Sequence, residues 1–143
     1  MAEARGAFIL DTGFVVALLR ADDSDHDRCV EVWNELRAPR LTSVEGVLLE
    51  SAHLLRRFRG GAAAIAGLVY GAATELVPTT RERAQRAVSL MDKYHDVPMD
   101  FVDALLVTAA EERNVRDVLT LDRRGFETYR ANGRERFRIL PEV

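Results

Sequence analysis

The sequence predicts an α/β protein in which a central, mainly parallel sheet of four to five strands is covered by helices on both faces. Three observations support this prediction. Short apolar segments of strand length are present, and so are segments whose apolar residues recur at helical spacing. The two kinds of segment alternate along the chain, as the strand–helix–strand units of a parallel sheet require. The composition is that of an ordinary globular protein, with 48% hydrophobic and 30% charged residues.

The first half of the chain contains two predicted strands and the helices that follow them. Residues 8–20 begin with an apolar run of strand length and continue with helical character. Within residues 25–37 the apolar side chains fall on one helical stripe, which predicts a helix with one buried face. A second short strand is expected at residues 41–44. Thr42 and Glu45 have the spacing of a capping box for the helix that comes next.

The second half of the chain continues the alternation. An Ala-rich apolar segment at residues 62–73 is expected to be helical, although it carries fewer motif-like features than its neighbours. The further expected elements are, in order, a strand at 75–77 closed by Pro78, helices at 81–94 and 100–113, and strands at 118–121 and 137–140.

Size and composition predict one compact unit. The 143 residues can bury a substantial core, and we expect residues 1–143 to form a single domain. Cys29 is the single cysteine, so no internal disulfide can form. The chain has neither a signal-peptide pattern nor an apolar span of about 20 residues, which predicts a cytoplasmic protein without a membrane anchor. The net charge of −3 neither demands nor excludes a polyanionic substrate.

Four acidic residues stand where acids are rare, at the ends of apolar segments or inside them. Asp11 ends the first predicted strand and Asp122 the fourth, whereas Glu50 and Asp103 lie within apolar helical segments. In a parallel sheet the carboxyl ends of the strands meet at one edge, where ligands bind. Clustered carboxylates need a counter-charge, and their hard oxygens suit Mg²⁺ or Mn²⁺ better than Zn²⁺. The pattern predicts a metal site that gathers all four acids.

Each of these acids also has an ordinary explanation. Asp11 could cap the helix that follows it, Glu50 could lie on a solvated helix rim, and Asp122 could belong to a plain loop. Asp103 has the spacing of an acidic capping box with Asp100, but Asp100 suits the cap itself and leaves Asp103 freer for the site. The histidines have no paired metal-ligand spacing and are interpreted as surface or packing residues: His26, His53 and His95.

Four segments, in their order along the chain, resemble the motifs of PIN-domain ribonucleases, and most of all those of VapC-type toxins of bacterial toxin–antitoxin pairs. These segments are residues 9–12, 48–52, 101–106 and 119–126. The most specific pieces are the pair Asp103-Ala104 within an apolar helix and the run from Thr120 to Phe126. The resemblance covers essentially the full chain.

The resemblance implies a PIN-like three-layer α/β/α fold and an endoribonuclease that uses Mg²⁺ or Mn²⁺ to hydrolyse RNA phosphodiester bonds. The residues carried over as both catalytic and metal-binding are Asp11, Glu50, Asp103 and Asp122, and Thr120 is carried over as their hydroxyl partner. The resemblance further implies an RNA substrate, a small antitoxin protein as a partner, and a homodimer.

Several alternatives stay open from the sequence. Arg123 and Arg124 follow a proposed site acid and are candidate contacts for the RNA backbone, or else ordinary solvated loop residues. A solitary PIN nuclease in RNA processing is one alternative function, and a non-catalytic, metal-stabilised protein-binding module is another. A phosphatase of the haloacid dehalogenase type would need a second acid at the position of Gly13, so this function is disfavoured.

Overall fold

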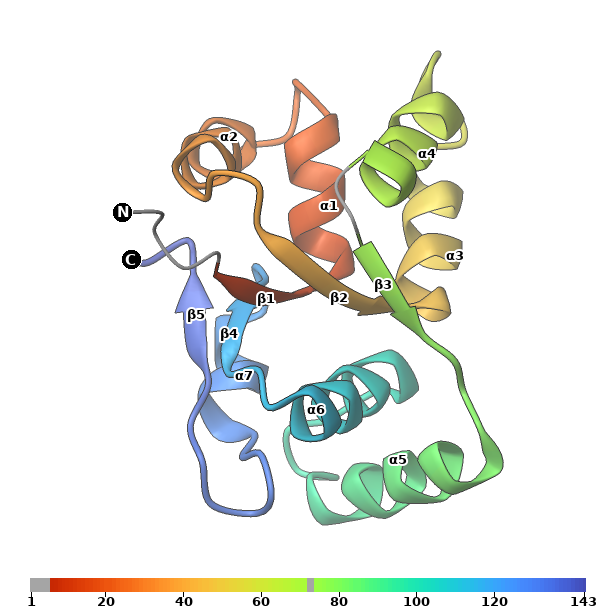
Figure 1. The fold of residues 1–143 in the computed structure, drawn as a ribbon, viewed down its shortest axis with the longest axis vertical. Coiled ribbons are helices and arrows are strands. Elements are labelled where there is room, and N and C mark those ends of the chain that lie inside the picture. The colour runs from red at the N-terminus through yellow and green to blue at the C-terminus, as the bar shows by residue number, and fades with distance from the viewer. Residues whose placement is uncertain (1–5, 72–73) are drawn as a thin grey trace.

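The computed structural model describes residues 6–71 and 74–143 and contains a five-stranded sheet in which all neighbouring strands are parallel (Figure 1). The strands are β1 (Ala7–Leu10), β2 (Arg40–Val44), β3 (Thr74–Val77), β4 (Asp117–Leu119) and β5 (Arg138–Leu140). Their order across the sheet is β3-β2-β1-β4-β5, so the first strand of the chain is the central one. The predicted parallel sheet of four to five strands is confirmed.

Helices cover both faces of the sheet, which makes the fold a three-layer α/β/α arrangement. The helices are α1 (Thr12–Leu19), α2 (His26–Glu35), α3 (Glu45–Leu54), α4 (Gly61–Gly71), α5 (Arg81–Lys93), α6 (Phe101–Arg113) and α7 (Arg123–Thr128). In Figure 1, α1 to α4 lie on one side of the sheet and α5 and α6 on the other. The last two residues of the helix expected at 62–73 lie outside the described residues. No helix within the described ranges is both long and apolar enough to cross a membrane.

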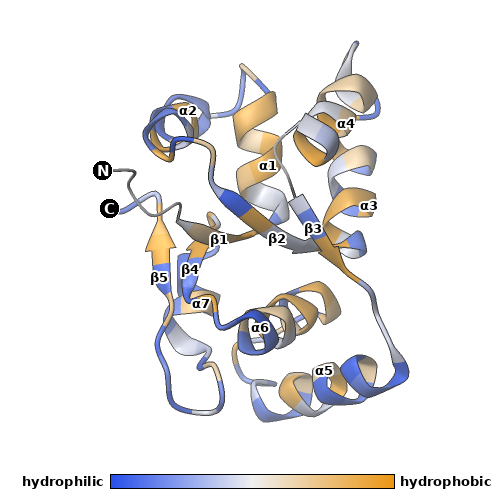
Figure 2. Cartoon of the chain, in the orientation of Figure 1, coloured by the Kyte–Doolittle hydropathy of each residue, from blue (hydrophilic) through white to orange (hydrophobic). Residues whose placement is uncertain are grey.

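The core lies on both faces of the central strands. Ile9 in β1 and Val118 in β4 are fully buried, as central strands of a parallel sheet should be. Helix α6 packs between the sheet and α5, so that residues 104–110 are all buried. Figure 2 shows mainly apolar residues along α1, whereas α2 and α5 alternate between apolar and polar residues. The apolar helix that carries Asp103 is therefore an interior element.

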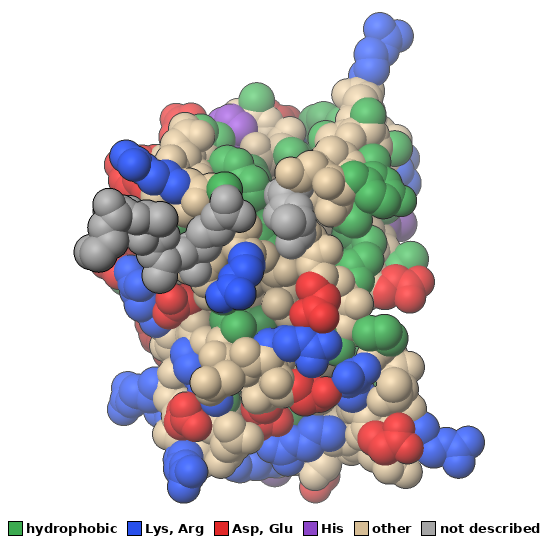
Figure 3. Space-filling model, viewed as in Figure 1, with side chains coloured by type: hydrophobic (Ala, Val, Ile, Leu, Met, Phe, Trp, Pro, Cys, Tyr) green, Lys and Arg blue, Asp and Glu red, His purple; other side chains and the backbone are tan. Residues whose placement is uncertain are grey.

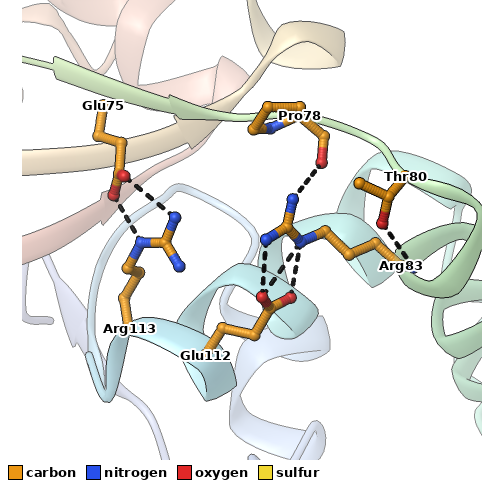
Figure 4. A network of polar contacts seen from close by, with 6 residues as sticks. All are labelled: Glu75, Pro78, Thr80, Arg83, Glu112 and Arg113. Carbon is orange, nitrogen blue, oxygen red and sulfur yellow. Dashed lines mark hydrogen bonds and ion pairs between the residues drawn. The ribbon is translucent and has the colours of Figure 1, made fainter.

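Arginine–glutamate pairs join β3, α5 and α6 at the surface. Arg83 donates hydrogen bonds to both carboxylate oxygens of Glu112 and to the carbonyl of Pro78, and Arg113 donates to both oxygens of Glu75 (Figure 4). Figure 3 shows acidic and arginine side chains interspersed over this part of the surface. Partly exposed ion pairs of this kind contribute little to the free energy of unfolding. We therefore infer that the main effect of the network is to fix the path of the chain that follows β3.

Three local predictions differ from the structure around the ends of strands. The strand predicted at 118–121 ends two residues earlier, at Leu119, because the chain turns into α7, a short helix that was not predicted. Thr42 and Glu45 form no capping box. Thr42 is buried within β2, and the N-cap of α3 is Val44, without a side-chain hydrogen bond.

The central position of α6 predicts a large difference between two leucine substitutions. Leu106 in α6 is 0% exposed and Leu49 in α3 is 65% exposed. Leu106→Ala should lower the free energy of unfolding by about 2–5 kcal/mol, because it leaves a cavity in the core. Leu49→Ala is the matched control and should change it by less than about 0.5 kcal/mol. Urea denaturation measures both, and similar losses in the two variants would contradict this packing.

Candidate active site

The four predicted acids come from four different elements, and three of them lie at helix N-termini. Asp11 directly follows β1, and Asp122 follows β4, the neighbour of β1 in the sheet. Asp103 lies in the first turn of α6, and Glu50 lies in the second half of α3. Strand ends that lie side by side bring Asp11 and Asp122 to the carboxyl edge of the sheet, where an α/β fold binds ligands.

Asp11 is the buried centre of this group, with 8% of its surface exposed. Its Oδ1 accepts a hydrogen bond from the backbone N–H of Thr12 at 2.8 Å, so it caps α1, and its Oδ2 accepts one from the hydroxyl of Thr120 at 2.7 Å. Burial raises the pKa of Asp11 from 3.8 to about 6 against the effect of these hydrogen bonds, and the charges of Asp122 and Glu50 raise it further. Asp11 therefore caps α1 and also belongs to the acidic cluster of Asp11, Glu50, Asp103 and Asp122.

Glu50 is exposed and is held toward the start of α1 by a single hydrogen bond. The hydroxyl of Thr12 donates to its Oε1 at 2.8 Å. Thr12 therefore links Glu50 to the backbone next to Asp11, across 38 residues of sequence. The charge of Glu50 contributes to the raised pKa of Asp11, which shows that the two carboxylates interact.

Asp103 is half-buried, and it belongs to the N-terminal cap of α6. Asp100 is the N-cap of α6, as predicted, and its Oδ1 accepts from the backbone N–H of Asp103 at 2.8 Å. Asp103 is less free than predicted, because its Oδ2 completes the capping box by accepting from the N–H of Asp100 at 3.3 Å. Burial raises the pKa of Asp103 from 3.8 to about 7, and the charges of Asp100, Asp11 and Asp122 raise it further.

Asp122 is exposed and caps α7, so the alternative explanation of a plain loop acid does not apply. Its Oδ1 accepts from the backbone N–H of Gly125 at 3.1 Å. Its own backbone N–H donates to the hydroxyl oxygen of Thr120 at 3.0 Å. Thr120 is 1% exposed and donates to Asp11, so one buried hydroxyl joins the two strand-end acids. The hydroxyl-partner role predicted for Thr120 matches these contacts.

Three residues that lie against the acids were not singled out from the sequence. The first is Thr12, which donates to Glu50. The second is Tyr129, whose hydroxyl donates to Oδ2 of Asp103 at 3.4 Å, and the third is Gly125, which lies against Asp122. Burial, followed by the charges of Asp103 and Asp122, raises the pKa of Tyr129, so its hydroxyl stays protonated. Gly125 lies within the motif-like run from Thr120 to Phe126, whereas the signal for Tyr129 was its position seven residues after Asp122, an interval of one helical face.

The acidic cluster has the chemistry of a divalent-cation site but lacks a protein counter-charge. Among the ion pairs of the described residues, none joins an arginine, lysine or histidine to any of the four acids. Carboxylate oxygens without a cationic partner, with the pKa values of Asp11 and Asp103 raised by burial and by neighbouring acids, fit Mg²⁺ or Mn²⁺. Within residues 6–71 and 74–143, no three potential ligand side chains lie close enough to hold one ion in the present arrangement. Binding would therefore require the carboxylates to draw together.

The raised pKa of Asp11 predicts that the metal-free protein loses stability as the pH rises. Between 3.8 and about 6 the unfolded chain releases a proton that the folded chain keeps, so rising pH favours the unfolded state. This group alone lowers the free energy of unfolding by about 3 kcal/mol across the whole window, and by less than half of that between pH 5 and pH 8. Asp103 acts in the same direction.

Urea denaturation in EDTA at pH 5 and pH 8 measures this loss. Asp11→Asn cannot titrate at this position, so its free energy of unfolding should fall by roughly 1 kcal/mol less than that of the parent over the same interval. An equal pH dependence in the parent and the variant would show that the Asp11 carboxyl is not destabilised by burial.

The sequence and the fold match those of known proteins. Residues 8–132 match the family model of the PIN domain. Ribonuclease VapC26 of Mycobacterium tuberculosis is 31% identical over 135 residues, which cover 93% of this chain and 99% of that protein.

Two solved structures show the same fold at low sequence identity. The crystal structure of Mycobacterium tuberculosis VapC20, a sarcin–ricin loop cleaving toxin, matches with a TM-score of 0.68 at 22% identity and covers 78% of this chain and 86% of that one. A toxin–antitoxin complex from Klebsiella pneumoniae matches with a TM-score of 0.60 at 14% identity and covers 85% and 91%. The family match, together with the sequence relative and the fold, shows that the chain belongs to the PIN-domain family and is of the VapC type.

Proposed function

We propose that this chain is a Mg²⁺- or Mn²⁺-dependent endoribonuclease and the toxin of a VapBC-type toxin–antitoxin pair. The observation that carries the proposal is the group of four acids at the carboxyl edge of the sheet, two of which have pKa values raised to about 6 and about 7. The absence of an arginine, lysine or histidine ion pair to any of these acids among the described residues adds support. The 31% identity to Ribonuclease VapC26 favours RNA as the substrate.

The residues that would hold the metal are Asp11, Glu50, Asp103 and Asp122. A divalent cation bound there would lower the pKa of a water molecule and stabilise negative charge on the phosphoryl and leaving oxygens. Asp11 supplies the anchoring carboxylate, because it is buried and its orientation is set by hydrogen bonds from Thr12 and Thr120.

Glu50 is our candidate for the group that orients the attacking water and accepts its proton. Its Oε1 is occupied by the hydroxyl of Thr12, while Oε2 accepts no hydrogen bond from the described residues and lies on an exposed side chain. A carboxylate with one oxygen fixed and the other facing solvent suits a general base. Asp122 is exposed as well, so Glu50 and Asp122 border the solvent from which RNA would approach.

The structure separates the two arginines that were candidate contacts for the RNA backbone. Arg123 donates to the carbonyl of Pro141 at 2.8 Å and pairs with Glu127 at 3.3 Å, so it helps to hold α7 in place. Arg124 is exposed, and its side chain makes no hydrogen bond or ion pair within the described part of the chain. Arg124 is therefore the better candidate for a phosphate contact.

The proposed partners follow from the VapC type. We expect a small antitoxin protein to silence the nuclease, a homodimer to be the assembly in solution, and the cytoplasm to be the compartment. The likeness to the toxin–antitoxin complex from Klebsiella pneumoniae supports the first of these expectations at the level of the fold.

Metal-dependent cleavage of RNA tests the proposed activity. The parent should cleave single-stranded RNA with added Mg²⁺ or Mn²⁺ and stop when EDTA is added. Asp11→Asn and Glu50→Gln should each lower the cleavage rate at least about 100-fold, because they remove a charge from the metal site or the general base.

A matched control separates this effect from a general change of charge. Asp117 lies at the start of β4, at the opposite edge of the sheet from the cluster, so Asp117→Asn should cleave like the parent. Activity that persists in EDTA, or that survives Asp11→Asn unchanged, would refute the proposed nuclease site.

The proposed role of Arg124 predicts a change in the salt dependence of RNA binding. In a Glu50→Gln background, which keeps the RNA intact, Arg124→Ala should weaken binding and lower the slope of log K against log[salt] by about 0.7, the value for one phosphate contact to a single strand. Arg59→Ala is the control, because Arg59 lies beside Leu19 at the end of α1 distant from Asp11. Equal slopes for the Arg124 and Arg59 variants would exclude a phosphate contact at Arg124.

A further inference from the structure

A tyrosine hydroxyl is buried beside two of the acids. Tyr129 is 1% exposed and ends α7, and its hydroxyl donates to Oδ2 of Asp103 on α6 at 3.4 Å. Oδ2 also accepts the N–H of Asp100, whereas Oδ1 of Asp103 accepts no hydrogen bond from the described residues. The two donors thus occupy one oxygen of the carboxylate and leave the other available.

The position of this hydroxyl is set by the ring that carries it. The ring of Tyr129 packs edge-on against Tyr94 and Phe126, each with a centroid distance of 5.2 Å. The hydroxyl of Tyr94 in turn accepts the backbone N–H of Arg130 at 3.0 Å, which ties the end of α7 to the end of α5. A phenylalanine at position 129 would fill the same apolar space. Burying a hydroxyl is costly unless it has a partner, and Asp103 is that partner.

A glycine keeps this space open on the side of Asp122. A Cβ atom at Gly125 would lie closer to Oδ2 of Asp122 than non-bonded atoms approach each other, and 2.9 Å from the hydroxyl oxygen of Tyr129. The carboxylate of Asp122 and the hydroxyl of Tyr129 therefore lie against the same point, and a side chain at position 125 would displace them. The conformation of Gly125 is helical, so the requirement is one of space and not of backbone angle.

We propose that Tyr129 is a positioning residue for the acidic site, with Gly125 as the residue that makes room for it. The hydroxyl of Tyr129 holds Oδ2 of Asp103, so that the carboxylate has a fixed orientation and its Oδ1 stays available to a divalent cation that the acids would hold. This inference rests on the proposed metal site and adds two residues that support its ligands. The loss of a hydrogen bond that orients a ligating side chain commonly lowers metal affinity or activity by about 10- to 100-fold.

Binding of Mn²⁺ alone, without RNA, tests the proposal. The concentration of free Mn²⁺ is followed by electron paramagnetic resonance while the parent, Tyr129→Phe and Gly125→Ala proteins are titrated. Tyr129→Phe should raise the dissociation constant for Mn²⁺ about 10-fold, and Gly125→Ala should raise it at least as much, because its Cβ displaces Asp122 and the tyrosine hydroxyl.

Two controls separate positioning from folding. Gly67 lies within α4 with no atom within 4 Å of a Cβ built on it, so Gly67→Ala should bind Mn²⁺ like the parent. Thermal unfolding in EDTA should show Tyr129→Phe folded with a midpoint close to that of the parent, since the ring packing is kept. In cleavage assays, added Mn²⁺ should restore most of the rate of Tyr129→Phe, which the loss of a purely structural residue would not allow.

The outcomes are distinguishable from those of the proposed function. If the parent binds Mn²⁺ and Tyr129→Phe binds it equally well, the positioning role is wrong while the metal site stands. If the parent binds no Mn²⁺ and cleaves no RNA with it, the metal site itself is wrong and the inference falls with it.

Discussion

The burial of one carboxylate at the end of the central strand is the constraint on which the site depends. Asp11 follows β1, which has a neighbour on each side, and its backbone N–H donates to the carbonyl of Leu119. The pairing with β4 therefore continues through Asp11 and prevents it from turning away from the core. Two hydrogen-bond donors reduce the free-energy cost of burying its charge. They do not remove this cost, so the pKa of Asp11 is still raised to about 6. A cation shared with neighbouring acids would complete the compensation.

The parallel fold offers the acids a second, partial compensation. In a sheet of this kind each helix begins near the carboxyl end of the preceding strand, so the N-termini of α1 and α7 point into the same edge, and α6 begins there as well. Backbone N–H groups and the helix dipole favour negative charge at such termini. Asp11, Asp103 and Asp122 each use one oxygen to accept a backbone N–H there. The fold can thus carry a concentration of acids that would otherwise oppose folding.

Capping and metal binding are compatible roles for the same residue. A carboxylate has two oxygens, and in Asp103 and Asp122 one of them is committed to a cap while the other accepts no backbone N–H. Helix capping and metal binding therefore do not exclude each other for these acids. Glu50 differs, because it lies within α3 and depends on the hydroxyl of Thr12 for its orientation. Its exposure and its free oxygen suit a ligand that also orients and deprotonates water.

The sequence by itself determined the alternation of strands and helices, the parallel sheet, and the PIN-domain motifs, because apolar periodicity and short motifs are local properties of the chain. It also placed Asp11 and Asp122 at strand ends, since an acid that closes an apolar run is visible in the sequence. The tertiary structure decided which hydroxyls meet these acids. Thr120 reaches Asp11 across 109 residues, and Tyr129 reaches Asp103 from another helix. Side-chain direction and close approach at Gly125 depend on how elements pack against one another, and a local pattern does not encode that packing.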